Sequence, residues 1–91
     1  MRFTWDPRKA RSNAKKHGVA FAEAVTVFAD PLADVVDDSV HAERSLILGA
    51  SAAGRLLVIV FEEREHDEVR VINARLATRA ERRRYEEGKQ A

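Results

Sequence analysis

The sequence predicts a single α+β domain with a short N-terminal strand, two helices, an antiparallel meander sheet and a C-terminal helix. Three observations support this order of elements. Apolar residues recur at helical spacing up to residue 28, four strand-like runs lie between residues 32 and 74, and a helix-capping pattern begins at Thr78. The connections between the runs are too short for a crossover helix, so neighbouring strands should pair antiparallel. The 91 residues, 1–91, suffice for one domain with one core.

The first two elements are a strand at residues 2–5 and the helix that follows it. The strand segment is short, alternating and aromatic. Asp6 is a suitable N-cap, Pro7 suits the first helical position, and Gly18 can end the helix in a left-handed conformation. The seam expected to face the core consists of Ala10, Ala14 and His17. Lysines and arginines occupy the other faces, so this helix should pack lightly and present a basic surface.

An apolar stripe predicts the second helix, and apolar runs predict the strands that follow it. The stripe lies within residues 21–28, and Asp30-Pro31 ends the helix. The strands are expected at residues 32–37, 44–51, 55–63 and 69–74. The run 55–63 is apolar on both faces, which is typical of a central strand covered on both sides. Ala52-Ala53-Gly54 predicts a hairpin turn before it.

The last helix has a strong start signal and almost no apolar face. Thr78 and Glu81 form a capping-box pattern, which places the start of the helix at Thr78. Only Ala80 and Tyr85 are apolar or aromatic inside it. A helix that is polar all round requires a partner, a ligand or dense ion pairing to stay formed.

Composition narrows the class of protein. Hydrophobic residues make up 45% of the chain and charged residues 34%, and no apolar run approaches the roughly 18 residues of a membrane span. The absence of cysteine excludes disulfides and thiolate metal sites, and it fits a cytoplasmic protein. The three histidines are scattered without HxH or HxxxH spacing, so we expect no metal site, and no cofactor.

Charge is distributed unevenly although the net charge is only +1. Residues 1–17 hold six Lys/Arg against one acid, and residues 69–91 hold seven against three. Residues 18–68 hold three Lys/Arg against eleven acids. If the two ends of the chain meet in the fold, a basic surface lies beside an acidic one. Solvated helix faces are the alternative explanation for any single charge run.

Arginines stand where the chain passes from one element to the next. Arg64 ends one predicted strand, Arg75 ends the next, and Arg79 opens the last helix. A fold does not require guanidinium groups at these points, whereas an anionic partner does. Arg79 in the first helical turn also opposes the helix dipole, a cost that a bound phosphate or carboxylate would reverse. These three arginines are therefore the leading candidates for electrostatic stabilisation of a phosphate.

Motifs along nearly the whole chain resemble the signature of the BrnT-type toxins. The N-terminal motifs are Phe3-Thr4-Trp5-Asp6-Pro7, Asn13-Ala14-Lys15-Lys16-His17-Gly18-Val19 and Phe21-Ala22-Glu23-Ala24. The later motifs are Asp30-Pro31, His41-Ala42-Glu43-Arg44, Gly54-Arg55-Leu56-Leu57-Val58 and Asn73-Ala74-Arg75-Leu76-Ala77-Thr78-Arg79-Ala80-Glu81-Arg82. Their shared order makes the resemblance more specific than any single motif.

The resemblance implies the toxin component of a type II toxin–antitoxin system. It implies a RelE-like fold and a metal-independent endoribonuclease that cuts RNA, inhibits translation and arrests growth. It also implies neutralisation by a co-encoded, dimeric, DNA-binding antitoxin of the BrnA type. Operator DNA would be contacted only through that complex, in which two copies of the toxin could pair. No membrane partner is implied.

Metal-independent RNA cleavage requires a base for the 2′-hydroxyl, an acid for the leaving oxygen and cations around the phosphate. His17 is one candidate for proton transfer, and a histidine that only caps the helix C-terminus is its structural alternative. Glu62 or Glu63 beside Arg64 is a second candidate, and a salt-bridged edge acid is the alternative there. The residues expected to bind RNA are Lys9, Lys15, Lys16, Arg44, Arg82, Arg83 and Tyr85. Tyr85 could instead pack the last helix onto the sheet.

Two other classes of function fit the same residues. The chain could bind nucleic acid without cleaving it, with lysines and arginines of the first and last helices on phosphates. It could also be chiefly an interaction protein whose basic surface receives an acidic antitoxin segment. RNA fragmentation by the chain alone separates the enzyme from both.

Overall fold

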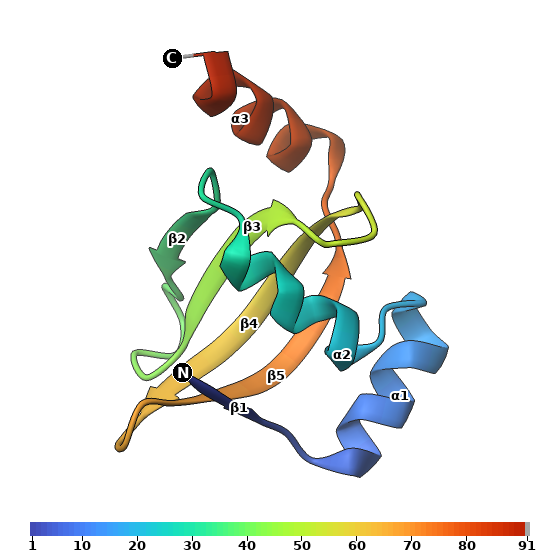
Figure 1. Cartoon of the computed structure of the whole chain (residues 1–91), viewed down its shortest axis with the longest axis vertical. Helices are drawn as coiled ribbons and strands as arrows, with labels where there is room; N and C mark the ends of the chain where they lie inside the picture. The colour runs from blue at the N-terminus through green and yellow to red at the C-terminus, as the bar shows by residue number, and fades with distance from the viewer. Residues whose placement is uncertain (91) are drawn as a thin grey trace.

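The computed structural model describes residues 1–90 and shows the predicted α+β order (Figure 1). The helical segments are α1 (Pro7–His17), α2 (Phe21–Ala24), the 3₁₀ helix η1 (Val25–Ala29) and α3 (Arg79–Gln90). The strands are β1 (Arg2–Thr4), β2 (Asp34–Asp37), β3 (Ser45–Ala50), β4 (Leu56–Arg64) and β5 (Glu68–Leu76). The second predicted helix is therefore one α-helical turn that continues as a 3₁₀ helix.

The five strands form one sheet in the order β1-β5-β4-β3-β2. The predicted antiparallel meander is confirmed, because β2, β3, β4 and β5 each pair antiparallel with the next strand. The short β1 pairs parallel with β5, from Arg2 opposite Glu68 to Thr4 opposite Arg70. A register shift in β5 opposite Val60 and Phe61 leaves Ile72 as an extra residue.

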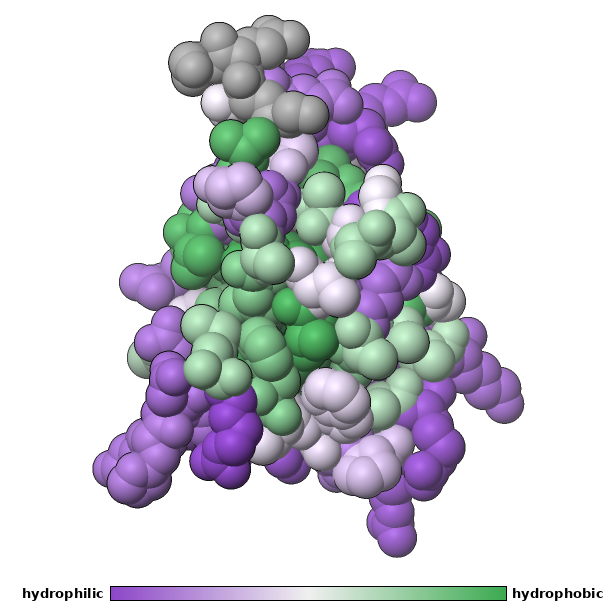
Figure 2. Space-filling model, viewed as in Figure 1, coloured by the Kyte–Doolittle hydropathy of each residue, from purple (hydrophilic) through white to green (hydrophobic). Residues whose placement is uncertain are grey.

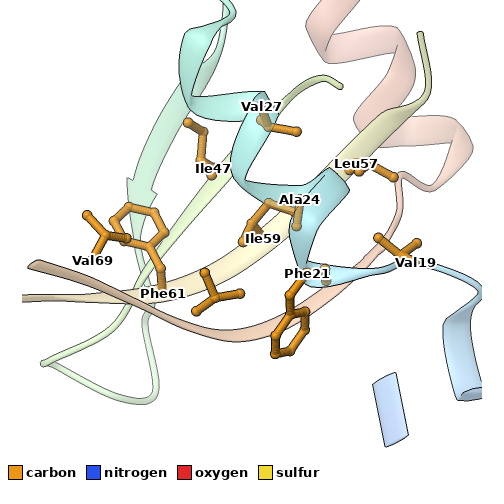
Figure 3. Close-up of a cluster of buried hydrophobic side chains, with 11 residues drawn as sticks. Val19, Phe21, Ala24, Val27, Ile47, Leu57, Ile59, Phe61 and Val69 are labelled. Carbon is orange, nitrogen blue, oxygen red and sulfur yellow. The ribbon is translucent and has the colours of Figure 1, made fainter. Parts of the chain in front are cut away.

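One face of the sheet is covered by α2 and η1, and α1 lies along the edge at β5 (Figure 1). The main core lies between these helices and the sheet (Figure 3). Phe21 from α2 and Val27 from η1 meet Leu57, Ile59 and Phe61 of β4 there. Close approach of η1 to β3 requires Gly49, because an added Cβ would lie 2.9 Å from a methyl group of Val27. Figure 2 shows this helix-covered side, which is apolar over its middle and hydrophilic at its margins.

The buried seam of α1 differs from the predicted one. Ala14 is exposed, whereas Asn13 is only 6% exposed. The Asn13 side-chain amide donates to the carbonyl oxygens of Val19 (2.9 Å) and Ala74 (2.8 Å), and its oxygen accepts from the Ala74 N–H (3.1 Å). Asn13 thus pairs with β5 beyond the end of β1, where the strand would otherwise leave backbone groups unsatisfied.

The opposite side of the sheet is mostly uncovered, and we call it the open face. Side chains alternate along each strand, so β4 presents Val58, Val60, Glu62 and Arg64 on this side. Among the elements within residues 1–90, only α3 packs on it, where Tyr85 joins a small cluster with Leu48, Leu56 and Val58. β4 is therefore covered on both sides at its start and on one side farther along.

The two basic helices do not meet. α1 and α3 lie at opposite ends of the molecule (Figure 1). The predicted caps of both helices are present: Asp6 accepts from the Arg8 N–H at 2.8 Å, and Glu81 accepts from the Thr78 N–H at 2.8 Å. Within residues 1–90, no helix is long and apolar enough to cross a membrane.

Candidate functional site

The structure gathers the predicted site residues into three places. Two of these are on the open face, one around Glu62 and one around Arg75. The third is a groove between α1 and β5, which contains Lys9, Lys16 and His17. The remaining predicted residues do not join these groups.

The Glu62 cluster stands near the end of β4. Arg64 donates to Glu62 Oε1 at 2.8 Å, and Arg44 Nε, from the loop before β3, lies 3.6 Å from Glu62 Oε2. The hydrogen bond from Arg64 is the largest influence that lowers the pKa of Glu62, and the charges of Arg64 and Arg44 add to it against the opposing effect of burial. Glu62 is therefore an ionised carboxylate that orients two guanidinium groups. The Arg44 Nε is buried and has no hydrogen-bond partner among the described residues.

Arg70 extends this cluster, and sequence reasoning missed it. Arg70 of β5 is the residue directly opposite Glu62 of β4 on the open face. Its charge also contributes to the lowered pKa of Glu68, for which the hydrogen bond from Thr4 is the largest cause. Strand pairing could have identified Arg70, because its position is fixed by the register of the hairpin between β4 and β5.

Arg75 is held by Glu81 across the junction of β5 and α3. The two guanidinium nitrogens Nη1 and Nη2 donate to the two carboxylate oxygens of Glu81 at 2.7 and 2.9 Å. The Arg75 hydrogen bond is the main cause that lowers the pKa of Glu81 to about 2, and it raises the pKa of Arg75 in turn. Glu81 thus serves both the helix cap and Arg75.

The contact with Glu81 leaves part of Arg75 available for a ligand. Glu81 occupies the end of the guanidinium, and Nη1 also reaches the Leu76 carbonyl oxygen at 3.3 Å. Within residues 1–90, the Arg75 Nε donates no hydrogen bond. The Nε–H and the second Nη2–H form a parallel pair of donors, which is the geometry that binds a phosphate through two oxygens.

The groove between α1 and β5 has a volume of about 190 Å³. Lys9, Lys16 and His17 line it from α1 together with Ser12, and Asn73 lines it from β5. Neither lysine has an acidic partner within the part of the chain that the structure describes. Asn73 precedes Arg75 by two residues on β5, a separation of about 7 Å in a strand. The groove therefore ends two residues before Arg75 along β5.

Some predicted residues lie outside these groups. The exposed cations that join no group are Lys15, Arg79, Arg82 and Arg83. Tyr85 packs α3 onto the sheet, and its hydroxyl donates to Asp30 Oδ2 at 2.6 Å, which raises the pKa of Tyr85 to about 12. Tyr85 therefore has the role that was the alternative to RNA binding, namely packing the last helix onto the sheet.

Sequence reasoning also missed the pair formed by Arg84 and Asp34. The Arg84 Nε donates to Asp34 Oδ2 at 3.0 Å and joins α3 to β2 across 50 positions of sequence. Arg84 belongs to the basic run of α3, but nothing in the sequence indicated that it, and not Arg82 or Arg83, would pair with an acid. Among the described residues, no group of three or more His, Cys, Asp or Glu is placed to hold a metal ion.

Comparison with known proteins finds a matching family and a similar solved structure. A protein-family model described as "Ribonuclease toxin, BrnT, of type II toxin-antitoxin system" matches residues 5–81. The fold is similar to the 1.1 Å crystal structure of the Brucella abortus ribonuclease toxin BrnT, with a TM-score of 0.72 and 25% sequence identity. That similarity covers 87% of this chain and 99% of the Brucella chain. No curated protein sequence matches the chain.

Proposed function

Since the chain belongs to the BrnT family of ribonuclease toxins of type II toxin–antitoxin systems, we propose that it cleaves RNA without a metal ion. The observation that supports this most is the placement of Arg44, Arg64 and Arg75 on one uncovered sheet face, where Glu62 and Glu81 hold their guanidinium groups. Arginines positioned in advance can stabilise charge on a phosphate without reorganising during the reaction.

The proposed reaction is an attack of the RNA 2′-hydroxyl oxygen on the adjacent phosphorus. A new P–O bond forms, the bond to the 5′-oxygen breaks, and the products are a 2′,3′-cyclic phosphate and a 5′-hydroxyl. A base takes the 2′-proton and an acid supplies a proton to the 5′-oxygen. Arg75 would bind the non-bridging phosphate oxygens through its Nε–H and Nη2–H.

We assign proton transfer to His17 in preference to Glu62. His17 lines the groove that reaches Asn73, two residues before Arg75 on β5, together with Lys9 and Lys16. Glu62 is paired with two arginines, and its lowered pKa makes it a weak base at neutral pH. The role of Glu62 in this assignment is to orient Arg44 and Arg64.

Arg44 and Arg64 would bind the RNA backbone away from the reacting phosphate. Arg75 is opposite Val58, and Val58 and Glu62 are four residues apart on β4, which corresponds to about 13 Å. An RNA strand must therefore run along the open face to reach both places. Of the exposed cations, Lys15, Arg79, Arg82 and Arg83 would add long-range attraction for RNA, which weakens as salt increases.

The partners follow from the family and remain part of the proposal. The chain would inhibit translation in the cytoplasm by cutting RNA, with a RelE-like active face. A dimeric, DNA-binding antitoxin of the BrnA type would neutralise it, and their complex would bind operator DNA through the antitoxin. Pairing of two toxin chains would occur only inside that complex.

Expression of the chain alone tests the proposal. We expect growth arrest with fragmented cellular RNA, and we expect Arg75→Lys to reduce both sharply while the circular dichroism spectrum is unchanged. Arg11→Ala is the matched control, because it removes an exposed arginine of α1 that lies outside the three groups, and it should stay toxic. Growth arrest with intact RNA would instead support the non-catalytic binding function and reject the nuclease.

A further inference from the structure

Between the open face and the start of α3 lies a hollow of about 300 Å³, and of its lining residues the proposed reaction uses Arg75 and, to hold Arg75, Glu81. Its floor is made of aliphatic side chains from three neighbouring strands, namely Val36, Leu46, Leu48 and Val58. Its walls are two ion pairs that join α3 to the sheet, Arg75 with Glu81 and Arg84 with Asp34. An apolar floor with a few polar groups at the rim is typical of a small-molecule site, and the volume is at the lower end for such sites.

We infer that this hollow binds a nucleobase of the RNA substrate, and specifically a base that carries an exocyclic amino group. The inference rests on the proposed function, because Arg75 both lines the hollow and presents the donors assigned to the phosphate. A nucleotide whose phosphate is bound by Arg75 has its base within reach of the aliphatic floor. Flat rings gain dispersion contacts on such a floor whichever base they belong to.

Asp34 provides the discrimination among bases. Both hydrogen bonds from Arg84 go to Asp34 Oδ2. Within residues 1–90, Asp34 Oδ1 accepts no hydrogen bond. A carboxylate oxygen only accepts, so it selects N–H donors on a base. Guanine, adenine and cytosine carry an amino group at the ring edge. Uracil has one donor, N3–H, between two carbonyl oxygens that the carboxylate would repel.

Arg84 strengthens this selection by holding the Asp34 carboxylate in place. Its contact to Oδ2 leaves Oδ1 at the rim of the hollow, where a base edge would lie. Asp34 is about half exposed, at 47%, so a ligand can reach it without displacing the core. Replacing Asp34 by asparagine keeps the shape of the side chain but adds an N–H donor. That donor could bind a carbonyl oxygen of uracil, so the variant would also bind uracil.

The test is an NMR titration of the ¹⁵N-labelled full chain with AMP, GMP, CMP or UMP, and separately with inorganic phosphate. We expect the first three nucleotides to shift the amide signals of Leu46, Leu48 and Val58, and UMP to bind at least ten-fold more weakly. Inorganic phosphate should leave these signals unchanged. Asp34→Asn should bring UMP to within about two-fold of CMP.

A matched pair of variants controls for the site. Val36→Trp fills the hollow from its floor and should abolish the shifts, whereas Val40→Trp, at a 79% exposed loop position, should keep them. Equal binding of UMP, or shifts confined to the groove between α1 and β5, would overturn the inference. Protection of the hollow by the antitoxin, with no response to nucleotides, would assign it to the protein partner and also overturn it. The titration measures binding alone, so it gives its answer whether or not the chain cleaves RNA.

Discussion

Asn13 is the residue whose replacement should most clearly disturb the attachment of α1 to the sheet. Asn13→Ala removes three hydrogen bonds and leaves the carbonyl of Val19 and both backbone groups of Ala74 without partners. Val19 and Ala74 are both 0% exposed, so water reaches these groups poorly. Each buried polar group left unpaired costs about 1–3 kcal/mol. Because Asn13 lines the groove between α1 and β5, some of them will be rehydrated, and we expect a total loss of about 3–5 kcal/mol.

Urea unfolding followed by the fluorescence of Trp5 measures this loss, because the Trp5 ring packs against Phe21 of the core at a centroid distance of 5.9 Å. The melting temperature should fall by at least about 12 °C in a domain of this size. Ser12→Ala is the control, since Ser12 is exposed on the same helix, and it should change the stability by less than about 0.5 kcal/mol. A loss below about 1 kcal/mol for Asn13→Ala would show that these hydrogen bonds are not what attaches α1 to β5.

Two further predictions concern the core and the helix cap. Phe61→Ala should cost about 3–5 kcal/mol in denaturant unfolding, because Phe61 is 2% exposed and packs edge-on to Phe28 at 5.0 Å; a cost under about 1 kcal/mol would contradict the central position of β4. The second prediction concerns acid, because the pKa of Glu81 is lowered from its ordinary value of 4.5 to about 2. The ionised Glu81 therefore stabilises the fold fully above pH 4.5, and this stabilisation is lost as the pH falls from 4.5 towards 2. Over that window the wild type should lose about 1–3 kcal/mol more than Glu81→Gln, a range reduced for partial exposure to solvent, and parallel pH profiles would refute the assignment.

Local signals explain why the order of elements could be predicted. The Asp6 cap, the left-handed Gly18 with φ 68° and the Thr78 capping box each act within a few residues, so the sequence carries them directly. Strand runs separated by short turns permit only antiparallel neighbours, which is the observed meander.

Contacts between distant residues could not be predicted in the same way. Helical spacing placed Ala14 in the seam of α1, but Asn13 fits the same spacing. Both residues lie three or four positions from Ala10 and from His17, so either can share a face with that pair. The free edge of β5 decides which of the two is buried, because Asn13 can satisfy its backbone and Ala14 cannot. The parallel pairing of β1 likewise depends on contacts across more than 60 residues.

Some predicted site residues lie together in the structure and others lie apart, and the sequence could not separate the two sets for a physical reason. Arginine and lysine are usually solvated, so a basic run does not reveal which side chain has an ordered acidic partner. Arg44, Arg64 and Arg75 have such partners, while Arg79, Arg82 and Arg83 of the same charge are simply exposed. Which arginines are ordered depends on Glu62 and Glu81. The sequence had suggested Glu62 as a base, with a salt-bridged acid as the alternative, and Glu81 as a helix cap.

Cleavage of a defined RNA by the purified chain in EDTA tests the central claim most directly. Arg75→Lys keeps the charge and removes the paired donors, so it isolates the geometry on which the phosphate assignment depends. We predict that the wild type cleaves in EDTA and leaves a 2′,3′-cyclic phosphate, and that Arg75→Lys lowers kcat about 100-fold while the fold is retained. Cleavage that requires an added divalent metal, or unchanged cleavage by Arg75→Lys, would contradict the account.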